Sequence, residues 1–189
     1  MRGWGANEEP KSTILSALAV RVEFTSWLGK GKARMHWISL LLWLGICFAV
    51  AGTGGWLTAG EIDGWYQTLR RPTIAPPNGV FGPVWTLLYV LMAVAAWQVW
   101  QAEPSLLRTA GIALFLVQLA LNLAWSWLFF NKHDIGVALV DVILLWFVVG
   151  FTTLIFGGVT PLAAWLMLPY QAWLTFAAVL NGAYWLLNR

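Results

Sequence analysis

Five long stretches of the sequence are almost free of charged residues, and this pattern constrains the fold more than any other feature. A helix needs about 20 mostly apolar residues to cross the hydrocarbon core of a bilayer. The five stretches meet this requirement, and Asp141 is the only charged residue within them. They cover residues of about 37–57, 81–101, 109–130, 135–156 and 161–187. The sequence therefore predicts an all-α integral membrane protein, a five-transmembrane-helix bundle.

The composition excludes a soluble domain. Hydrophobic residues make up 60% of the chain and charged residues only 10%, whereas soluble domains carry about 25% charged residues. A disordered chain is excluded for the same reason. The linkers near 102–108, 131–134 and 157–160 are short, so we expect the helices they join to be antiparallel neighbours.

Charge is concentrated in the first 34 residues, which supply the whole formal net charge of +3. The other 155 residues hold five acidic and five basic residues and are neutral. A neutral membrane domain offers no basic groove for nucleic acid. The single cysteine, Cys47, cannot form a disulfide within the chain, and the two histidines do not stand at metal-ligand spacing, so we expect no metal site.

Two domains follow from this distribution. Residues 1–34 are expected to form a polar, flexible N-terminal tail, and residues 35–189 the five-helix membrane domain. The basic residues Lys30, Lys32 and Arg34 directly precede Met35. No apolar segment in the tail has the length of a signal peptide. A short amphipathic surface segment is one interpretation of the tail. We expect instead that the tail is dispensable, with Met35 as the true start.

The loop between the first two stretches, residues 58–80, is much longer than the other connections. Long loops in compact proteins are usually lids or binding loops. A flexible connector is the alternative, but tryptophan, tyrosine and proline make this loop stiff. We therefore predict a lid loop at 58–80.

Other polar and aromatic residues have two interpretations each. Many of the 15 tryptophans stand near helix ends, where indoles anchor a protein at the membrane surface, whereas deeper ones are suited to stacking on flat ligands. Asp141, Asn122 and Asn181 are either structural or functional polar groups. Val179, Tyr184 and Arg189 fit a loose sterol-type motif, and ordinary interfacial anchors fit it equally well. No residue set for hydrolysis or phosphoryl transfer appears.

Several motifs together resemble one membrane protein family. The lid loop and second helix carry Trp65-Tyr66-x-x-Leu69-x-Arg71-Pro72-x-x-x-Pro76-Pro77 and Phe81-Gly82-Pro83-Val84-Trp85-Thr86-x-Leu88-Tyr89. The later helices carry Asn122-x-x-Trp125-Ser126-x-x-Phe129-Phe130, Ala138-Leu139-Val140-Asp141 and Pro169-Tyr170-x-x-Trp173-x-x-Phe176-Ala177-x-x-Leu180-Asn181. Over residues 36–189 the chain resembles the tryptophan-rich sensory protein / translocator protein family, also called peripheral-type benzodiazepine receptors.

The resemblance implies a multi-pass membrane receptor or binding protein for porphyrins (protoporphyrin IX, haem) and related apolar ligands such as sterols, with a regulatory or stress-related role. The tetrapyrrole is a ligand, and no cofactor is expected to be required. It also implies a homodimer, for which Ala120-x-x-x-Ala124 offers a small-residue face. By motif position, the expected ligand-binding residues are Tyr66, Asn122, Trp125, Phe129, Trp173, Ala177 and Leu180. The expected lid residues are Trp65, Arg71, Pro72, Ile74, Pro76 and Pro77.

Two alternative functions stay open, a transporter of tetrapyrroles and an enzyme of light-dependent porphyrin degradation. The resemblance links the degradation to two tryptophans, of which one falls on Trp173, the candidate catalytic residue. The other falls on Ile74 in the lid loop. Because isoleucine cannot be oxidised as indole can, the sequence predicts slow or absent light-driven porphyrin loss, and faster loss after Ile74→Trp.

A chain that begins at Met35 is predicted to fold and to bind ligand as the full chain does, because the expected membrane domain is complete without the tail. Thermal unfolding and ligand titration of both chains in detergent check this. A lower melting temperature or weaker binding in the shorter chain would contradict it.

Overall fold

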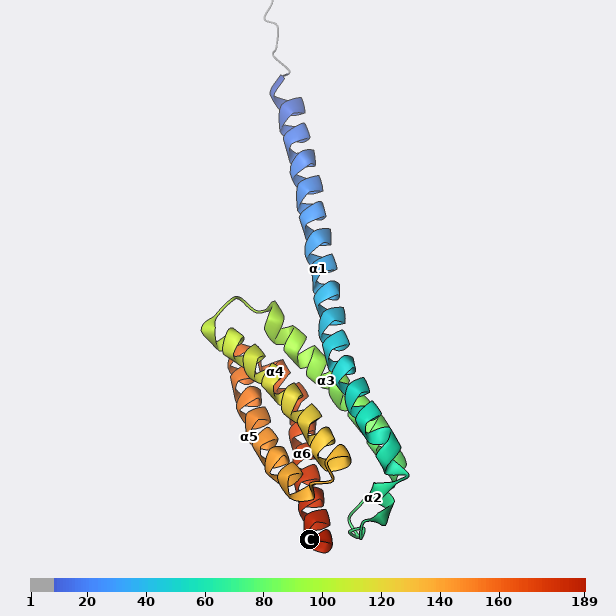
Figure 1. Ribbon diagram of the computed structural model, residues 1–189. Helices are drawn as coiled ribbons and strands as arrows, with labels where there is room; N and C mark the ends of the chain where they lie inside the picture. Colours follow the sequence, from blue (N-terminus) through green and yellow to red (C-terminus); the bar gives the residue numbers. More distant parts are fainter. Residues whose placement is uncertain (1–8) are drawn as a thin grey trace, which may run out of the picture. The chain divides into compact units, whose positions relative to one another are not determined.

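The structure, a computed structural model, describes the backbone of residues 9–189 and the side chains of residues 36–189 (Figure 1). No strand occurs among residues 9–189. The elements are α1 (Glu9–Ile62), α2 (Trp65–Thr68), η1 (Asn78–Val80), α3 (Phe81–Gln101), α4 (Leu106–Ser126), η2 (Trp127–Asn131), α5 (Ile135–Val159) and α6 (Pro161–Asn188). The chain divides into two compact units with the boundary between Ser39 and Leu40, and the second unit holds the helix bundle.

Five helical segments of the described residues are long and apolar enough to cross a membrane, which confirms the predicted fold class. They are His36–Ile62, Asn78–Gln101, Leu106–Asn131, Ile135–Val159 and Pro161–Asn188. Each agrees with its sequence prediction to within a few residues. The largest extension is at the end of the first span, which continues to Ile62, and no proline stands between 57 and 62.

Helix α1 also continues on the N-terminal side of Met35, as far as Glu9. Its backbone is therefore helical through most of the segment expected to be a tail. The first eight residues of that segment lie outside the described residues. The flexibility and the dispensability of the tail stay predictions.

Helix starts in the bundle are set by local chemistry. The Ser105 hydroxyl accepts a hydrogen bond from the backbone N–H of Arg108 (3.1 Å) and caps α4. Asp134 caps α5 in the same way, accepting from the N–H of Val137 (2.9 Å). Such caps satisfy N–H groups that have no partner within the helix. Helix α6 begins with Pro161, whose missing N–H costs nothing in a first turn.

The helices of the second unit form a closed arrangement. Helix α5 packs between α4 and α6, and α6 also packs on α3. Trp43 of α1 completes the ring, because its indole contacts Trp100 of α3 (5.9 Å between ring centroids) and Phe115 of α4 (5.6 Å). The order around the bundle is therefore α1, α3, α6, α5, α4.

One neighbour relation differs from the expectation. Helices α3 and α4 follow each other in sequence, yet α3 contacts α6 more extensively than it contacts α4. The physical reason is that α1 lies between α3 and α4 in the ring, where Trp43 contacts both helices.

Candidate functional site

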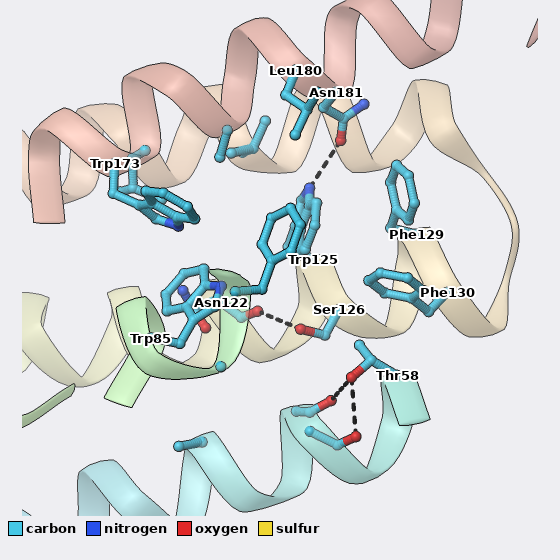
Figure 2. Close-up of a pocket in the computed structure, with 18 of the residues that line it drawn as sticks. Thr58, Trp85, Asn122, Trp125, Ser126, Phe129, Phe130, Trp173, Leu180 and Asn181 are labelled. Carbon is cyan, nitrogen blue, oxygen red and sulfur yellow. Dashed lines mark hydrogen bonds between the residues drawn. The ribbon is translucent and has the colours of Figure 1, made fainter. Parts of the chain in front are cut away.

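A cavity of about 460 Å³ opens within the bundle, and the loop that joins α1 to α3 borders it through Tyr66 and Asn78. Figure 2 shows part of its lining. Small-molecule sites typically occupy about 300–1,000 Å³. Helices α1, α3, α4, α5 and α6, the turn η2 and the loop itself all contribute to its wall. A cavity of this size within the described residues is the first candidate for a ligand site.

All residues that the sequence assigned to ligand binding line this one cavity. They come from the loop, from α4 and η2, and from α6, segments far apart in the sequence. The set is Tyr66, Asn122, Trp125, Phe129, Trp173, Ala177 and Leu180. The structure therefore brings the whole expected set together, including the candidate catalytic residue Trp173.

Aromatic rings form two opposite parts of the wall. On one side Trp125 stacks on Phe129 (5.2 Å between centroids, 27° between planes), and Phe129 contacts Phe130 at 5.0 Å. On the other side Trp85 and Trp173 meet edge to face at 6.3 Å. Figure 2 shows Trp173 and Trp85 at the left of the cavity and the two phenylalanines at the right. This arrangement leaves flat, apolar surfaces facing the enclosed space.

The turn η2 explains how two consecutive phenylalanines reach the same cavity. Residues Trp127–Asn131 form a π-helical turn at the end of α4. A π turn contains an additional residue relative to an α turn and so rotates the following side chains. Phe129 and Phe130 both line the cavity as a result.

Asn122 provides the polar floor of the cavity. Its carbonyl oxygen accepts a hydrogen bond from the Tyr89 hydroxyl (2.7 Å), and its amide donates to the Tyr170 hydroxyl (2.9 Å). The three residues come from α4, α3 and α6. Unpaired polar groups are costly in the membrane interior, so these bonds both satisfy the amide and join three helices.

Asn181 holds the Trp125 side chain in place. The Trp125 indole donates to the Asn181 carbonyl oxygen (2.9 Å), and the Asn181 amide donates to the backbone carbonyl of Ile135 (2.9 Å). Figure 2 shows the first of these bonds crossing from α4 to α6. Asn181 thus fixes an aromatic wall residue to the start of α5.

The covering loop is shorter than predicted, since residues 58–62 continue α1 as helix. Residues 63–80 are called the lid from here on. Hydrogen bonds attach the lid directly to α6. The hydroxyls of Tyr66 and Tyr184 are 2.7 Å apart, and the Asn188 amide pairs with the backbone of Arg70, at 2.8 Å to the N–H and 3.1 Å to the carbonyl. Burial and the Tyr184 hydroxyl raise the pKa of Tyr66 above its ordinary value, so its phenol stays protonated.

A second contact attaches the lid to the segment between η2 and α5. The Trp65 indole stacks on the His133 imidazole, with centroids 4.1 Å apart. The imidazole Nε2 in turn lies 3.0 Å from a carboxylate oxygen of Glu61 at the end of α1. His133 adopts a left-handed backbone conformation (φ 55°), which is uncommon for a residue with a side chain. The lid is therefore held at two separate places.

The expected lid residues do not line the cavity. The Arg71 guanidinium donates to the carbonyls of Ala75 and Pro76. Trp65 contacts His133, as described, and Pro72 is buried. Ile74 is 47% exposed. The full set outside the cavity lining is Trp65, Arg71, Pro72, Ile74, Pro76 and Pro77.

The three residues of the sterol-type motif do not share one surface. Val179 is 59% exposed on the outer face of α6, whereas Tyr184 is only 2% exposed and lines the cavity. The Arg189 guanidinium lies over the Trp185 ring, 5.4 Å from its centroid. Positions five residues apart point in different directions on a helix, which explains the separation.

Asp141 lies outside the cavity lining. One of its carboxylate oxygens is buried without a hydrogen-bond partner in the described structure. Among the described residues, no group of three or more histidine, cysteine, aspartate or glutamate side chains is placed to hold a metal ion.

Sequence reasoning did not assign several parts of the cavity wall, Trp85 and the α1 side among them. Trp85 belongs to the motif that begins at Phe81. Its position inside the uncharged stretch 81–101 is the sequence feature that could have identified it. The α1 side of the wall consists mainly of small residues. They recur every three or four positions, a spacing that places them on one helix face, and they are Ala51, Gly54, Gly55, Thr58 and Ala59.

The hydrogen bond between Trp125 and Asn181 is expected to stabilise the fold by about 0.5–1.5 kcal/mol, the range of polar contacts between membrane helices. A double-mutant cycle with Trp125→Phe and Asn181→Leu measures it through the free energy of unfolding. A coupling energy near zero would mean that Asn181 does not hold the indole.

Known proteins resemble this chain over most of its length. A model of the TspO/MBR family matches residues 43–186. The "Tryptophan-rich protein TspO" of Chlorobaculum tepidum is 37% identical over 148 residues, which cover 76% of this chain and 92% of that protein.

Two further relatives widen the comparison. The "Translocator protein" of Homo sapiens is 41% identical over 128 residues, which cover 67% of this chain and 76% of that protein. The "Protein CrtK" of Rhodobacter capsulatus is 34% identical over 143 residues, which cover 75% of this chain and 88% of that protein. Motifs, fold and relatives agree, and the chain is an integral, multi-pass membrane protein that belongs to the TspO/MBR family.

Proposed function

We propose that this protein is a membrane receptor that binds porphyrins and related apolar ligands, sterols among them, in the cavity beneath the lid. The observation that carries the proposal is the pair of opposed aromatic walls, Trp125 with Phe129 and Trp85 with Trp173. A flat conjugated macrocycle gains most from stacking against such surfaces. A regulatory or stress-related role follows from the resemblance to the family.

Hydrogen-bonding groups in the wall favour a ligand that carries acceptors. Asn122 and Asn181 are both engaged with protein partners. Trp85 and Trp173 line the cavity, and their indole N–H groups make no hydrogen bond within the described part of the chain. Porphyrin carboxylates and carbonyl groups are acceptors that these two donors suit.

The wall favours metal-free protoporphyrin over haem. Haem iron in proteins is usually held by histidine, cysteine, methionine or tyrosine. The lining contains no histidine, cysteine or methionine. The hydroxyls of its tyrosines, Tyr66, Tyr89 and Tyr184, are all engaged in hydrogen bonds. Protoporphyrin IX is therefore the ligand to test first.

A binding role fits the architecture better than transport. Alternating-access transporters are usually built from internal repeats that rock about a central site. The sequence shows no such repeat, and the described bundle has five spans. Measuring porphyrin flux into proteoliposomes separates the two functions.

We also propose a homodimer formed through α4. Ala120 is exposed on this helix, and so are its neighbours Leu116 and Val117. A small residue on an exposed membrane helix lets another backbone approach closely.

Protoporphyrin IX is predicted to quench the tryptophan fluorescence, and Ala177→Thr to weaken its binding. Threonine adds bulk beside Trp173 in a closed wall, and overpacking costs about 1–3 kcal/mol, or about 5–150-fold in Kd. Fluorescence titration in detergent measures both effects. The matched control is Ala172→Thr, because Ala172 is exposed on the same helix and outside the lining. An equal loss of affinity in both variants would contradict the assigned wall.

A second candidate function is light-dependent porphyrin breakdown, and the contact between Trp85 and Trp173 favours it. The wall holds two adjacent indoles without any contribution from Ile74, which lies outside the lining. We therefore expect illumination of the bound porphyrin to cause pigment loss that Trp85→Phe and Trp173→Phe slow and that Ile74→Trp leaves unchanged. Absorbance under illumination measures the rate. If Ile74→Trp accelerates pigment loss and the two phenylalanine variants have no effect, the result would instead support the sequence-based prediction that Ile74 limits porphyrin breakdown.

A further inference from the structure

Some residues of the cavity wall are also exposed on the outer surface of the bundle. Most of the lining is buried or half-buried, but five lining residues are exposed. All five lie on α1, on η1 or in the first turns of α3. They are Gly55, Ala59, Asn78, Gly82 and Thr86. A residue that faces the cavity and the surface at once marks the rim of an opening.

Side chains do not fill this opening. A Cβ atom added at Gly55 or at Gly82 would meet no atom within 4 Å apart from its own chain neighbours. The Thr86 hydroxyl turns back to the Gly82 carbonyl of its own helix (2.9 Å). We call the opening between Gly55 and Ala59 of α1 and Gly82 and Thr86 of α3 the α1–α3 window.

Several other boundaries of the cavity are bridged. Tyr89 and Asn122 join α3 to α4, and Trp125 and Asn181 join α4 to α6. The lid is fastened by the Tyr66–Tyr184 pair and the paired bonds between Arg70 and Asn188. In the described structure, no hydrogen bond or ring contact joins residues 51–62 of α1 to residues 81–89 of α3. The window therefore combines exposed lining residues with the absence of any bond across it.

The window lies in a part of the bundle that is expected to be within the membrane. It lies within two segments long and apolar enough to cross the membrane, His36–Ile62 and Asn78–Gln101. Gly55 is seven residues from the end of α1, a distance of about 10 Å along the helix axis. A molecule that passes between these helices comes from the lipid and not from water.

We propose that ligands enter and leave the cavity sideways, from the bilayer core through the α1–α3 window, while the lid stays closed. The ligand class is then apolar molecules that first dissolve in the membrane. This inference rests on the proposed porphyrin binding.

The experiment compares the rates of protoporphyrin IX binding and release in lipid nanodiscs, followed by fluorescence. Gly55→Leu and Ala59→Leu narrow the window with a residue that favours helix. Gly52→Leu is the matched control, because Gly52 is exposed on the same helix, has no atom within 4 Å of an added Cβ and does not line the cavity. A disulfide between Arg70→Cys and Asn188→Cys locks the lid, since the backbone of Arg70 contacts the Asn188 side chain.

We expect both window variants to slow the release of bound porphyrin by about tenfold, because a narrower passage raises the barrier to exit. The control and the oxidised lid variant should keep the natural rates. Slow exchange in the locked lid with natural rates in the window variants would overturn the proposal. Faster release at an unchanged binding rate would also overturn it. Gly55 and Ala59 would then contact the bound ligand without bordering its route. Absence of binding in every chain, the natural one included, would overturn the proposed function itself and this route with it.

Discussion

The free-energy cost of an unpaired polar group in the membrane interior determines how these helices are joined. Asn122 accepts from Tyr89 and donates to Tyr170, and so connects α4 to α3 and α6. Asn181 connects α6 to α4 and to the start of α5 through Trp125 and Ile135. Lipid offers these amides no alternative partner. The two networks therefore fix the relative positions of the four helices that carry most of the cavity wall.

The cavity itself results from a mismatch in side-chain size. Glycine, alanine and threonine on one face of α1 leave space opposite the large rings of α4 and η2. The network around Asn122 holds α3, α4 and α6 at fixed positions, so the bundle does not collapse into this space. The lid covers one end of the cavity, and the α1–α3 window is left open towards the bilayer. Binding of a flat, apolar ligand is the function that this combination suits.

The sequence predicts much of this arrangement because its strongest signals are local. Stretches without charge define the five spans, and motif positions such as Asn122 and Trp173 identify the wall. Three features could not be predicted from the sequence. The π turn at Trp127–Asn131 leaves no pattern that distinguishes it from a helix end. The inward orientation of Tyr184 depends on a partner, Tyr66, that stands 118 positions away in the chain.

The third feature is the exclusion of Ile74 from the wall. The lid folds on itself through Arg71 and the carbonyls of Ala75 and Pro76. Trp85 therefore supplies the indole beside Trp173. A motif comparison matches positions in a loop, but only the folded loop shows which of them reach the ligand space.

An experimental structure of the protein with protoporphyrin IX in lipid nanodiscs tests the central claim most directly. The account predicts one porphyrin within the cavity, stacked against Trp125 and Phe129, in contact with Trp173 and covered by the lid. A porphyrin bound on the outer surface of the bundle, with the cavity empty or filled by lipid, would contradict it.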